Sequence, residues 1–255
     1  VIGMIYESRP NVTIDSAALC IKSGNSVILR GGSESMNSNK ALMKCIDNAF
    51  KKNKFHQHMV QLIETTDRSA VTHLLTKNQY IDVIIPRGGK GLIEKIVSCS
   101  KIPTIKHLDG NCHVYIDKTA DAKKAFDISI NSKTQRYGVC NAMETLLIHK
   151  SFPKKHITKI LNKYKEIGVE IRGCKNLIKI SSDIILAKET DWFEEYLSPI
   201  IAIKVVDSID DAINHIGKYG SLHTDAIIAS DKTMINKFKR LVNSSSVMIN
   251  TSTRF

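Results

Sequence analysis

Short apolar runs alternate with amphipathic helical patterns along this chain, and this alternation constrains the fold more than any other feature. Apolar residues follow one another in runs such as Val27-Ile28-Leu29, as is typical of strands that are buried on both faces. In the first half, the pattern predicts strands over 1–6, 26–30, 59–63, 81–85 and 104–108, and helices over 12–22, 34–50, 68–76 and 91–98. Strands that alternate with helices at this spacing form βαβ units and a parallel, doubly wound sheet.

A second α/β region follows the turn-forming residues Asp109-Gly110-Asn111. Its predicted strands cover 112–116, 144–148, 199–206, 225–229 and 247–250, and its predicted helices cover 121–132, 153–167, 209–219 and 232–242. We therefore expect two α/β domains, residues 1–111 and 112–255. The chain begins and ends beside strand-like runs, so we expect a central fragment of a longer protein.

Composition excludes some classes of function. No apolar stretch approaches the roughly 20 residues of a membrane helix, and the first residues do not form a signal peptide. The net charge of +12 comes from scattered lysines, without a nucleic-acid-binding motif or interleaved aromatic residues. We expect a Lys-rich, solvated surface that attracts anionic small molecules, and neither a membrane nor a nucleic acid as partner.

The cysteines and histidines predict no metal site. The six cysteines show no C-x-x-C pair, which argues against zinc binding and a disulfide framework and for a reducing, cytoplasmic setting. His56-Gln57-His58 has no neighbouring carboxylate or thiol, so a polar surface loop is the better interpretation than a pair of metal ligands.

Cys140 lies between a helical stretch and an apolar strand, at a junction that can present a thiol. A cysteine is a nucleophile only as the thiolate, which positive charge stabilises. Lys133 and Arg136 lie nearby in sequence, and Gly138 lets the backbone approach a ligand closely. For a free cysteine taken alone, a buried structural residue is the favoured interpretation, and the other motifs of the chain are what favour a nucleophile at Cys140.

Two glycine-rich turns follow predicted strands and precede predicted helices. They are Arg30-Gly31-Gly32-Ser33-Glu34 and Arg87-Gly88-Gly89. Backbone N–H groups at a helix N-terminus favour an anion, and ligands of open α/β sheets collect at the carboxyl ends of strands. The two turns together predict a nucleotide site, although neither matches G-x-G-x-x-G.

Asn11 follows the first predicted strand and directly precedes a helix. Asparagine is a good N-cap, and its amide can also donate a hydrogen bond to a developing oxyanion. Position alone leaves both interpretations open.

Five segments together resemble the gamma-glutamyl phosphate reductase family of the aldehyde dehydrogenase superfamily, and the resemblance extends along essentially the whole chain. The segments are Glu7-Ser8-Arg9-Pro10-Asn11-Val12-Thr13, residues 22–34, Lys106-His107-Leu108-Asp109-Gly110-Asn111, Lys133-Thr134-Gln135-Arg136-Tyr137-Gly138-Val139-Cys140-Asn141 and residues 250–255. The resemblance implies an NADP-binding, Rossmann-like domain over 1–111 and a catalytic domain over 112–255.

The same resemblance implies a reaction. Members of that family reduce L-glutamate 5-phosphate to L-glutamate 5-semialdehyde with NADPH, in proline biosynthesis. Cys140 then takes the role of nucleophile, and Asn11 forms the oxyanion hole with the Cys140 backbone N–H. His107 stands where hydrolytic members of the superfamily carry a glutamate that activates water, which argues against simple aldehyde oxidation.

The resemblance also implies residues that contact the ligands. The cofactor-binding residues are Arg30, Gly31, Gly32, Ser33 and Glu34 at the adenosine ribose, Arg87, Gly88 and Gly89 at the pyrophosphate, Leu108, and Glu195 at the nicotinamide ribose. Candidates for binding the substrate carboxylate or phosphate are Lys133, Arg136, His107, His223 and Arg254. The alternative interpretation is an exposed surface residue for Lys133, Arg136, His223 and Arg254. For His107 it is a packed polar residue.

Compared with that family, the chain lacks about the first quarter and a C-terminal piece with an oligomerising hairpin. The full-length form is implied to be a homo-oligomer associated with glutamate 5-kinase. Three alternatives stay open: another acyl-phosphate or acyl-thioester reductase of the superfamily, an inactive remnant, and a basic binding module.

Overall fold

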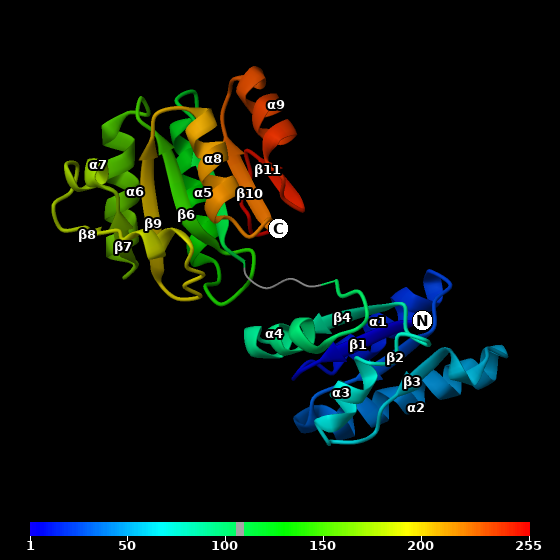
Figure 1. Ribbon diagram of the computed structural model, residues 1–255. Coiled ribbons are helices and arrows are strands. Elements are labelled where there is room, and N and C mark those ends of the chain that lie inside the picture. The colour runs from blue at the N-terminus through cyan, green and yellow to red at the C-terminus, as the bar shows by residue number, and fades with distance from the viewer. Residues whose placement is uncertain (106–109) are drawn as a thin grey trace. The chain divides into compact units, whose positions relative to one another are not determined.

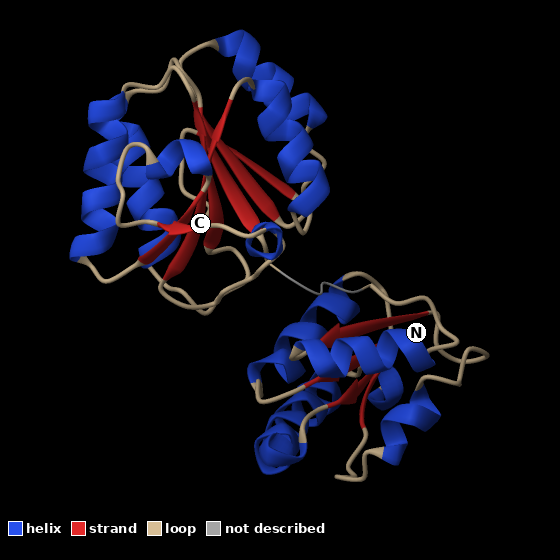
Figure 2. Cartoon of the chain, turned by 60° about the vertical axis from the view of Figure 1, so that its left-hand side comes forward, coloured by secondary structure: helices blue, strands red, loops and turns tan. Residues whose placement is uncertain are grey.

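The computed structural model describes residues 1–105 and 110–255, which form two compact units (Figure 1). Unit 1 is Val1–Leu108 and unit 2 is Asp109–Phe255, and each is described by itself. The division falls at 108–109, whereas the sequence suggested 111–112. Both units contain parallel sheets covered by helices, which confirms the predicted α/β fold class (Figure 2).

Unit 1 contains a four-stranded parallel sheet in the order β3-β2-β1-β4. The strands are β1 (Ile2–Tyr6), β2 (Val27–Arg30), β3 (Val60–Leu62) and β4 (Val83–Arg87). Of the strand predicted over 104–108, Thr104 forms a parallel bridge with Ile84, and residues 106–108 lie outside the described residues.

Helices cover both faces of this sheet. The helices of unit 1 are α1 (Asn11–Lys22), α2 (Met36–Asn53), α3 (Ser69–Leu74) and α4 (Lys90–Cys99), with short 3₁₀ turns η1 (Ser33–Ser35) and η2 (Gln57–Met59). Side chains alternate along β1, so Tyr6 packs in the cluster with α1 and α2, whereas Ile5 packs in the cluster with α3 and α4. Gly24 follows the end of α1 with a φ of 75°, a left-handed conformation that favours glycine.

Unit 2 contains a seven-stranded parallel sheet in the order β11-β10-β5-β6-β9-β7-β8. The strands are β5 (Cys112–Ile116), β6 (Met143–His149), β7 (Glu170–Gly173), β8 (Ile185–Leu186), β9 (Ile200–Val206), β10 (Thr224–Ile228) and β11 (Ser246–Ile249). Every residue of β5, β6 and β10 is buried, because helices cover both faces of the sheet.

The helices of unit 2 form two layers. They are α5 (Ala122–Thr134), α6 (Lys154–Glu166), α7 (Lys175–Ile178), α8 (Ile209–Tyr219) and α9 (Lys232–Leu241), with the 3₁₀ turn η3 (Glu189–Trp192). One face packs against α5, α6 and α7, and the other against α8 and α9. In the described ranges, no helix is both long enough and apolar enough to cross a bilayer.

Candidate active site

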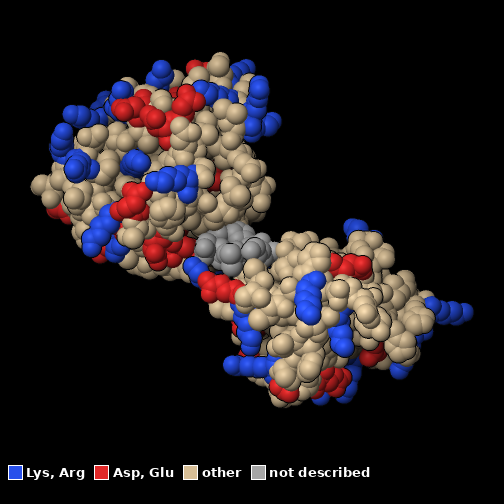
Figure 3. Space-filling model, viewed as in Figure 1, with Lys and Arg blue, Asp and Glu red and all other residues tan. Residues whose placement is uncertain are grey.

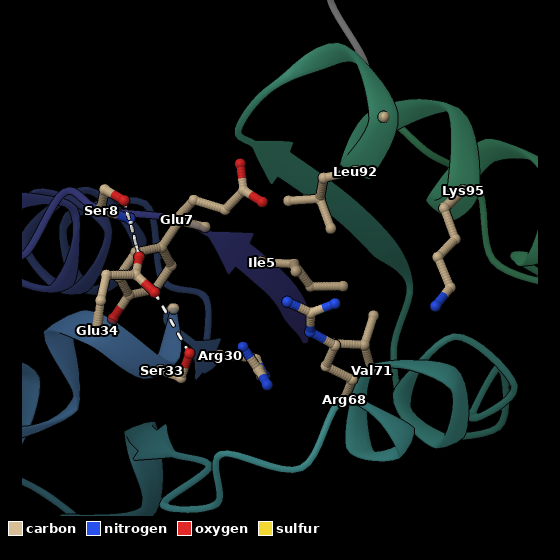
Figure 4. A pocket seen from close by; sticks show the side chains of 13 residues that line it. Ile5, Glu7, Ser8, Arg30, Ser33, Glu34, Arg68, Val71, Leu92 and Lys95 are labelled. Atoms are coloured by element: carbon tan, nitrogen blue, oxygen red, sulfur yellow. Dashed lines mark hydrogen bonds between the residues drawn. The ribbon is translucent and has the colours of Figure 1, made fainter.

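A cavity of about 510 Å³ opens in unit 1 where β1, β2 and β4 end (Figure 4). Its lining includes four of the predicted cofactor residues: Arg30, Gly32, Ser33 and Glu34. Gly31, which precedes Gly32, packs closely against α2, because a Cβ there would lie 2.1 Å from the buried Asn39 amide nitrogen. The carboxyl ends of parallel strands are where open α/β sheets bind ligands.

Arg30 places a positive charge in this cavity although only 7% of the residue is exposed. Its guanidinium donates hydrogen bonds to the backbone carbonyls of Gly31 at 2.6 Å, Asp67 at 3.2 Å and Thr66 at 3.4 Å. Within the described residues, its Nε is buried without a hydrogen-bond partner. Carbonyl groups do not neutralise the charge, so this site suits an anion.

Glu34 places a negative charge in the same cavity. Its carboxylate accepts hydrogen bonds from the Ser8 backbone N–H at 2.7 Å, the Ser8 hydroxyl at 2.8 Å and the Ser33 hydroxyl at 3.4 Å. The pKa of Glu34 is lowered to about 2, chiefly because its carboxylate accepts hydrogen bonds from its own backbone N–H and from that of Ser8. Glu34 is therefore ionised at neutral pH.

Arg68 and Lys95 were missed by sequence reasoning. Both line the cavity, and Figure 4 shows Glu34 at one end, Lys95 at the other, and Arg30 and Arg68 between them. Arg68 directly precedes α3, and Lys95 belongs to α4. Lys and Arg side chains are spread over the surface of each unit (Figure 3), so sequence gave no signal that set these two apart.

The second glycine-rich turn joins β4 to α4. Arg87 ends β4 with its side chain exposed, and Gly89 precedes the first residue of α4. The Gly89 N–H donates to Glu7 Oε2 at 2.9 Å, and a Cβ at Gly88 would lie 2.5 Å from the same oxygen. The α4 N-terminus thus binds a carboxylate of the chain itself, which is the preference expected of a helix N-terminus.

Cys140 lies in unit 2 in the loop 135–142, between α5 and β6, and is partly exposed. Gly110 packs so closely on it that a Cβ there would lie 2.0 Å from the Cys140 carbonyl oxygen. The Cys112 thiol donates to the same carbonyl at 3.2 Å, and burial raises the pKa of that thiol well above its usual range. The backbone of Cys140 is therefore held from two sides, in a residue that is partly exposed.

Glu195 joins this arrangement from a distant part of the chain. Its Oε1 accepts a hydrogen bond from the Gly110 N–H at 2.8 Å. Gly110 thus contacts both the predicted nucleophile and the predicted nicotinamide-ribose ligand.

Lys133 is not a surface residue, so the exposure alternative was wrong for it. Lys133 has no exposed area, and its ammonium forms an ion pair with Glu144 Oε2 at 2.5 Å. Glu144 is also completely buried. Burial is the largest cause of both pKa shifts: it lowers the pKa of Lys133 and raises that of Glu144 to about 7.

The other predicted substrate residues are more accessible. Arg136 is exposed in the Cys140 loop, and Arg254 donates from Nε to Gln135 Oε1 at 2.9 Å, which places it beside the same loop. His223 is partly buried, with its Nδ1 2.8 Å from the Thr224 hydroxyl.

Asn11 is the first residue of α1, and the N-cap position belongs to Pro10, so the capping interpretation was wrong. The Asn11 amide donates to Asp15 Oδ2 at 3.0 Å and is exposed. Asn11 belongs to unit 1 and Cys140 to unit 2, and the role of Asn11 as an oxyanion ligand stays a prediction. His107 and Leu108 lie outside the described residues.

Comparisons with known proteins agree with the fold and the motifs. The model of the aldehyde dehydrogenase family matches residues 10–173. The crystal structure of gamma-glutamyl phosphate reductase from Thermotoga maritima is 44% identical, with a TM-score of 0.94 over 100% of this chain and 61% of that chain. The corresponding enzyme from Saccharomyces cerevisiae is 36% identical, with a TM-score of 0.45 over 100% of this chain and 64% of that chain.

A third structure, an engineered glycolyl-CoA reductase with bound NADP+, is 17% identical, with a TM-score of 0.69 over 99% of this chain and 66% of that chain. At that identity the likeness shows the fold alone. The similarity to the Thermotoga maritima reductase confirms the resemblance found in the sequence. This chain spans 61% of the length of that reductase and 64% of the Saccharomyces cerevisiae reductase.

Proposed function

Because this chain belongs to the aldehyde dehydrogenase family, we propose that it carries the cofactor cavity and the nucleophilic thiol of an NADPH-dependent gamma-glutamyl phosphate reductase. The observation that carries the proposal is the junction at Cys140. This cysteine is partly exposed, its backbone is held by Gly110 and Cys112, and Glu195 accepts a hydrogen bond from the same glycine. Its substrate is L-glutamate 5-phosphate, and its product, L-glutamate 5-semialdehyde, belongs to proline biosynthesis.

The Cys140 thiolate attacks the acyl carbon of the acyl phosphate, and the carbon–oxygen bond to phosphate breaks. Phosphate leaves with the electron pair, and a thioester forms on Cys140. After hydride addition, the tetrahedral thiohemiacetal breaks its carbon–sulfur bond, which releases the aldehyde and regenerates the thiolate. Both tetrahedral species bear charge on oxygen, for which Asn11 and the Cys140 N–H are the proposed donors.

The residues of the unit 1 cavity fit a nicotinamide dinucleotide. The family implies such a cofactor, which supplies a hydride when bound. Arg30, a buried cation whose Nε has no hydrogen-bond partner in the described residues, suits a phosphate, and ionised Glu34 suits a ribose hydroxyl. Arg68 and Lys95 add positive charge, which favours NADPH over NADH.

The substrate is anionic at both ends, and Arg136 and Arg254 are the proposed contacts for its carboxylate and phosphate. Arg136 belongs to the Cys140 loop itself. Arg254 comes from the end of the chain and lies beside the loop, because it donates a hydrogen bond to Gln135. Guanidinium groups form paired hydrogen bonds with both kinds of oxyanion.

The test is the reverse reaction of the purified protein. Glutamate 5-semialdehyde, NADP+ and inorganic phosphate should together produce NADPH, and Cys140→Ser should abolish the reaction. A rate that does not depend on phosphate would reject the proposal. A rate that depends on coenzyme A instead would favour the alternative of an acyl-thioester reductase.

A further inference from the structure

The segment 193–198, which carries Glu195, is held by contacts at almost every residue although it contains neither helix nor strand. At its start, the Asn111 amide donates to the Trp192 carbonyl at 2.8 Å. The Tyr196 hydroxyl donates to Asp191 Oδ1 at 3.0 Å. These contacts connect the segment and its preceding residue to Asn111, the neighbour of Gly110, and to Asp191.

Glu144 contacts the backbone of this segment two residues after Glu195. Its Oε1 accepts a hydrogen bond from the Leu197 N–H at 3.3 Å. Leu197 has a φ of 51°, a left-handed conformation that disfavours a leucine. A bond to a buried carboxylate is a physical reason why this backbone conformation persists.

Lys133 holds Glu144 in place through the second carboxylate oxygen. Lys133 lies in the last turn of α5 and Glu144 near the start of β6, so their pairing closes the base of the Cys140 loop. The Lys133 ammonium also lies 5.9 Å from the ring centres of Tyr137, inside that loop, and of Tyr196, inside the segment 193–198.

A buried ion pair is weak evidence for stability, because desolvation of the two charges opposes their attraction. This pair has a more specific consequence: its members contact the nucleophile loop and the Glu195 segment at once. We propose that Lys133 and Glu144 are positioning residues that fix Glu195 relative to Cys140. The inference rests on the proposed function, in which Glu195 holds the nicotinamide ribose.

The experiment compares two double variants, Lys133→Met with Glu144→Gln and Lys133→Met with Glu144→Leu. Both remove the two charges together, so neither leaves a buried charge without its partner. Glutamine keeps an oxygen for the Leu197 N–H, and leucine of similar size does not. NADP+ should bind about tenfold more weakly to the leucine variant, as measured by calorimetric titration, because one hydrogen bond to the segment is lost.

A cycle with Glu195→Ala separates positioning from a general loss of structure. If Glu144 acts through Glu195, the two double variants should bind NADP+ equally once Glu195 is alanine. A persistent difference in that background, or equal affinity of the two double variants with Glu195 present, would overturn the proposal.

Hydrogen exchange provides a readout that needs no cofactor. The Leu197 amide should exchange as slowly as amides of β6 in the wild-type chain and in the glutamine variant, and faster in the leucine variant. Rapid exchange at Leu197 in the wild type would overturn the proposal even if the leucine variant failed to fold. Absence of NADP+ binding to the wild type would instead reject the proposed function.

Discussion

At the scale of single residues, Gly110 packs directly against the Cys140 backbone, which leaves no space for a side chain at position 110. We expect Gly110→Ala to destabilise the protein by about 1–3 kcal/mol, a typical cost of overpacking, because the new methyl group would meet the Cys140 carbonyl. Thermal unfolding should show the loss, and a thiol reagent should show a changed labelling rate at Cys140.

Gly138→Ala is the matched control for this prediction. Gly138 lies in the same loop as Cys140, but a Cβ there would meet nothing within 4 Å. Equal effects of the two alanines on unfolding and labelling would contradict the role given to Gly110.

Glu144 predicts a pH dependence of stability. The folded state holds a proton on this carboxyl up to about pH 7, whereas the unfolded chain loses it near pH 4.5. In that window the folded state binds more protons on Glu144, so this carboxyl should lower the free energy of unfolding as the pH rises from about 4.5 to about 7.

The pH prediction is checked by denaturant unfolding at pH 5 and pH 8. The double variant Lys133→Met with Glu144→Gln has no titrating group in this pair, so its stability should change less between the two pH values. The same decrease in the wild type and in the variant would assign the effect to other groups.

At the scale of elements, the N-terminus of α3 and the helix α4 position the cations that were not predicted from the sequence, Arg68 and Lys95. Arg68→Gln should raise the KM for NADPH about tenfold and change that for NADH little, because one charge-assisted hydrogen bond to a phosphate is worth about 1.5–3 kcal/mol. Steady-state kinetics with both cofactors measures the ratio.

Lys44→Gln controls for the loss of one positive charge, since Lys44 is exposed on α2 and is not among the residues that line the cavity. An equal rise in KM for both cofactors in Arg68→Gln would show that Arg68 does not distinguish them.

The predictability of the elements followed their burial. The buried strands β5, β6 and β10 were predicted because their apolar runs are nearly continuous. The strands β7 and β8 were missed: Glu170-Ile171-Arg172-Gly173 is short and half polar, and β8 pairs only two residues at the edge of the sheet. Of these two, β8 is the edge strand of the sheet, and edge strands are often very short, so hydrophobic patterns identify them poorly.

The site residues also differ in how well the sequence predicts them. Cys140 and the glycine turns stand in recognisable local sequences, and the resemblance singled them out. The contacts of Lys133 could not be predicted, because a lysine in a helical pattern is usually solvated. Its burial depends on Glu144 and Tyr196, which lie on other elements.

At the scale of the whole molecule, the chain consists of two compact units. We therefore expect the cofactor to slow hydrogen exchange mainly in the unit that contains its cavity. NADP+ at 100 times its Kd should raise the free energy of unfolding by about 2.7 kcal/mol if it binds only the folded protein. Hydrogen exchange should slow most in the peptides that line the unit 1 cavity, around 64–75 and 87–99. Protection confined to β10 and β11 would contradict the assignment of the cavity.

The hydrogen bonds that Glu34 accepts have a consequence for how cofactor affinity varies with acidity. Because this carboxylate stays ionised well below neutral pH, one end of the cavity keeps a constant charge from pH 5 to pH 8. A phosphate monoester, by contrast, takes up its second proton at about pH 6. A weakening of NADPH binding on acidification, absent for NADH, would therefore indicate titration of the ligand phosphate, since the Glu34 carboxylate keeps its charge over this range.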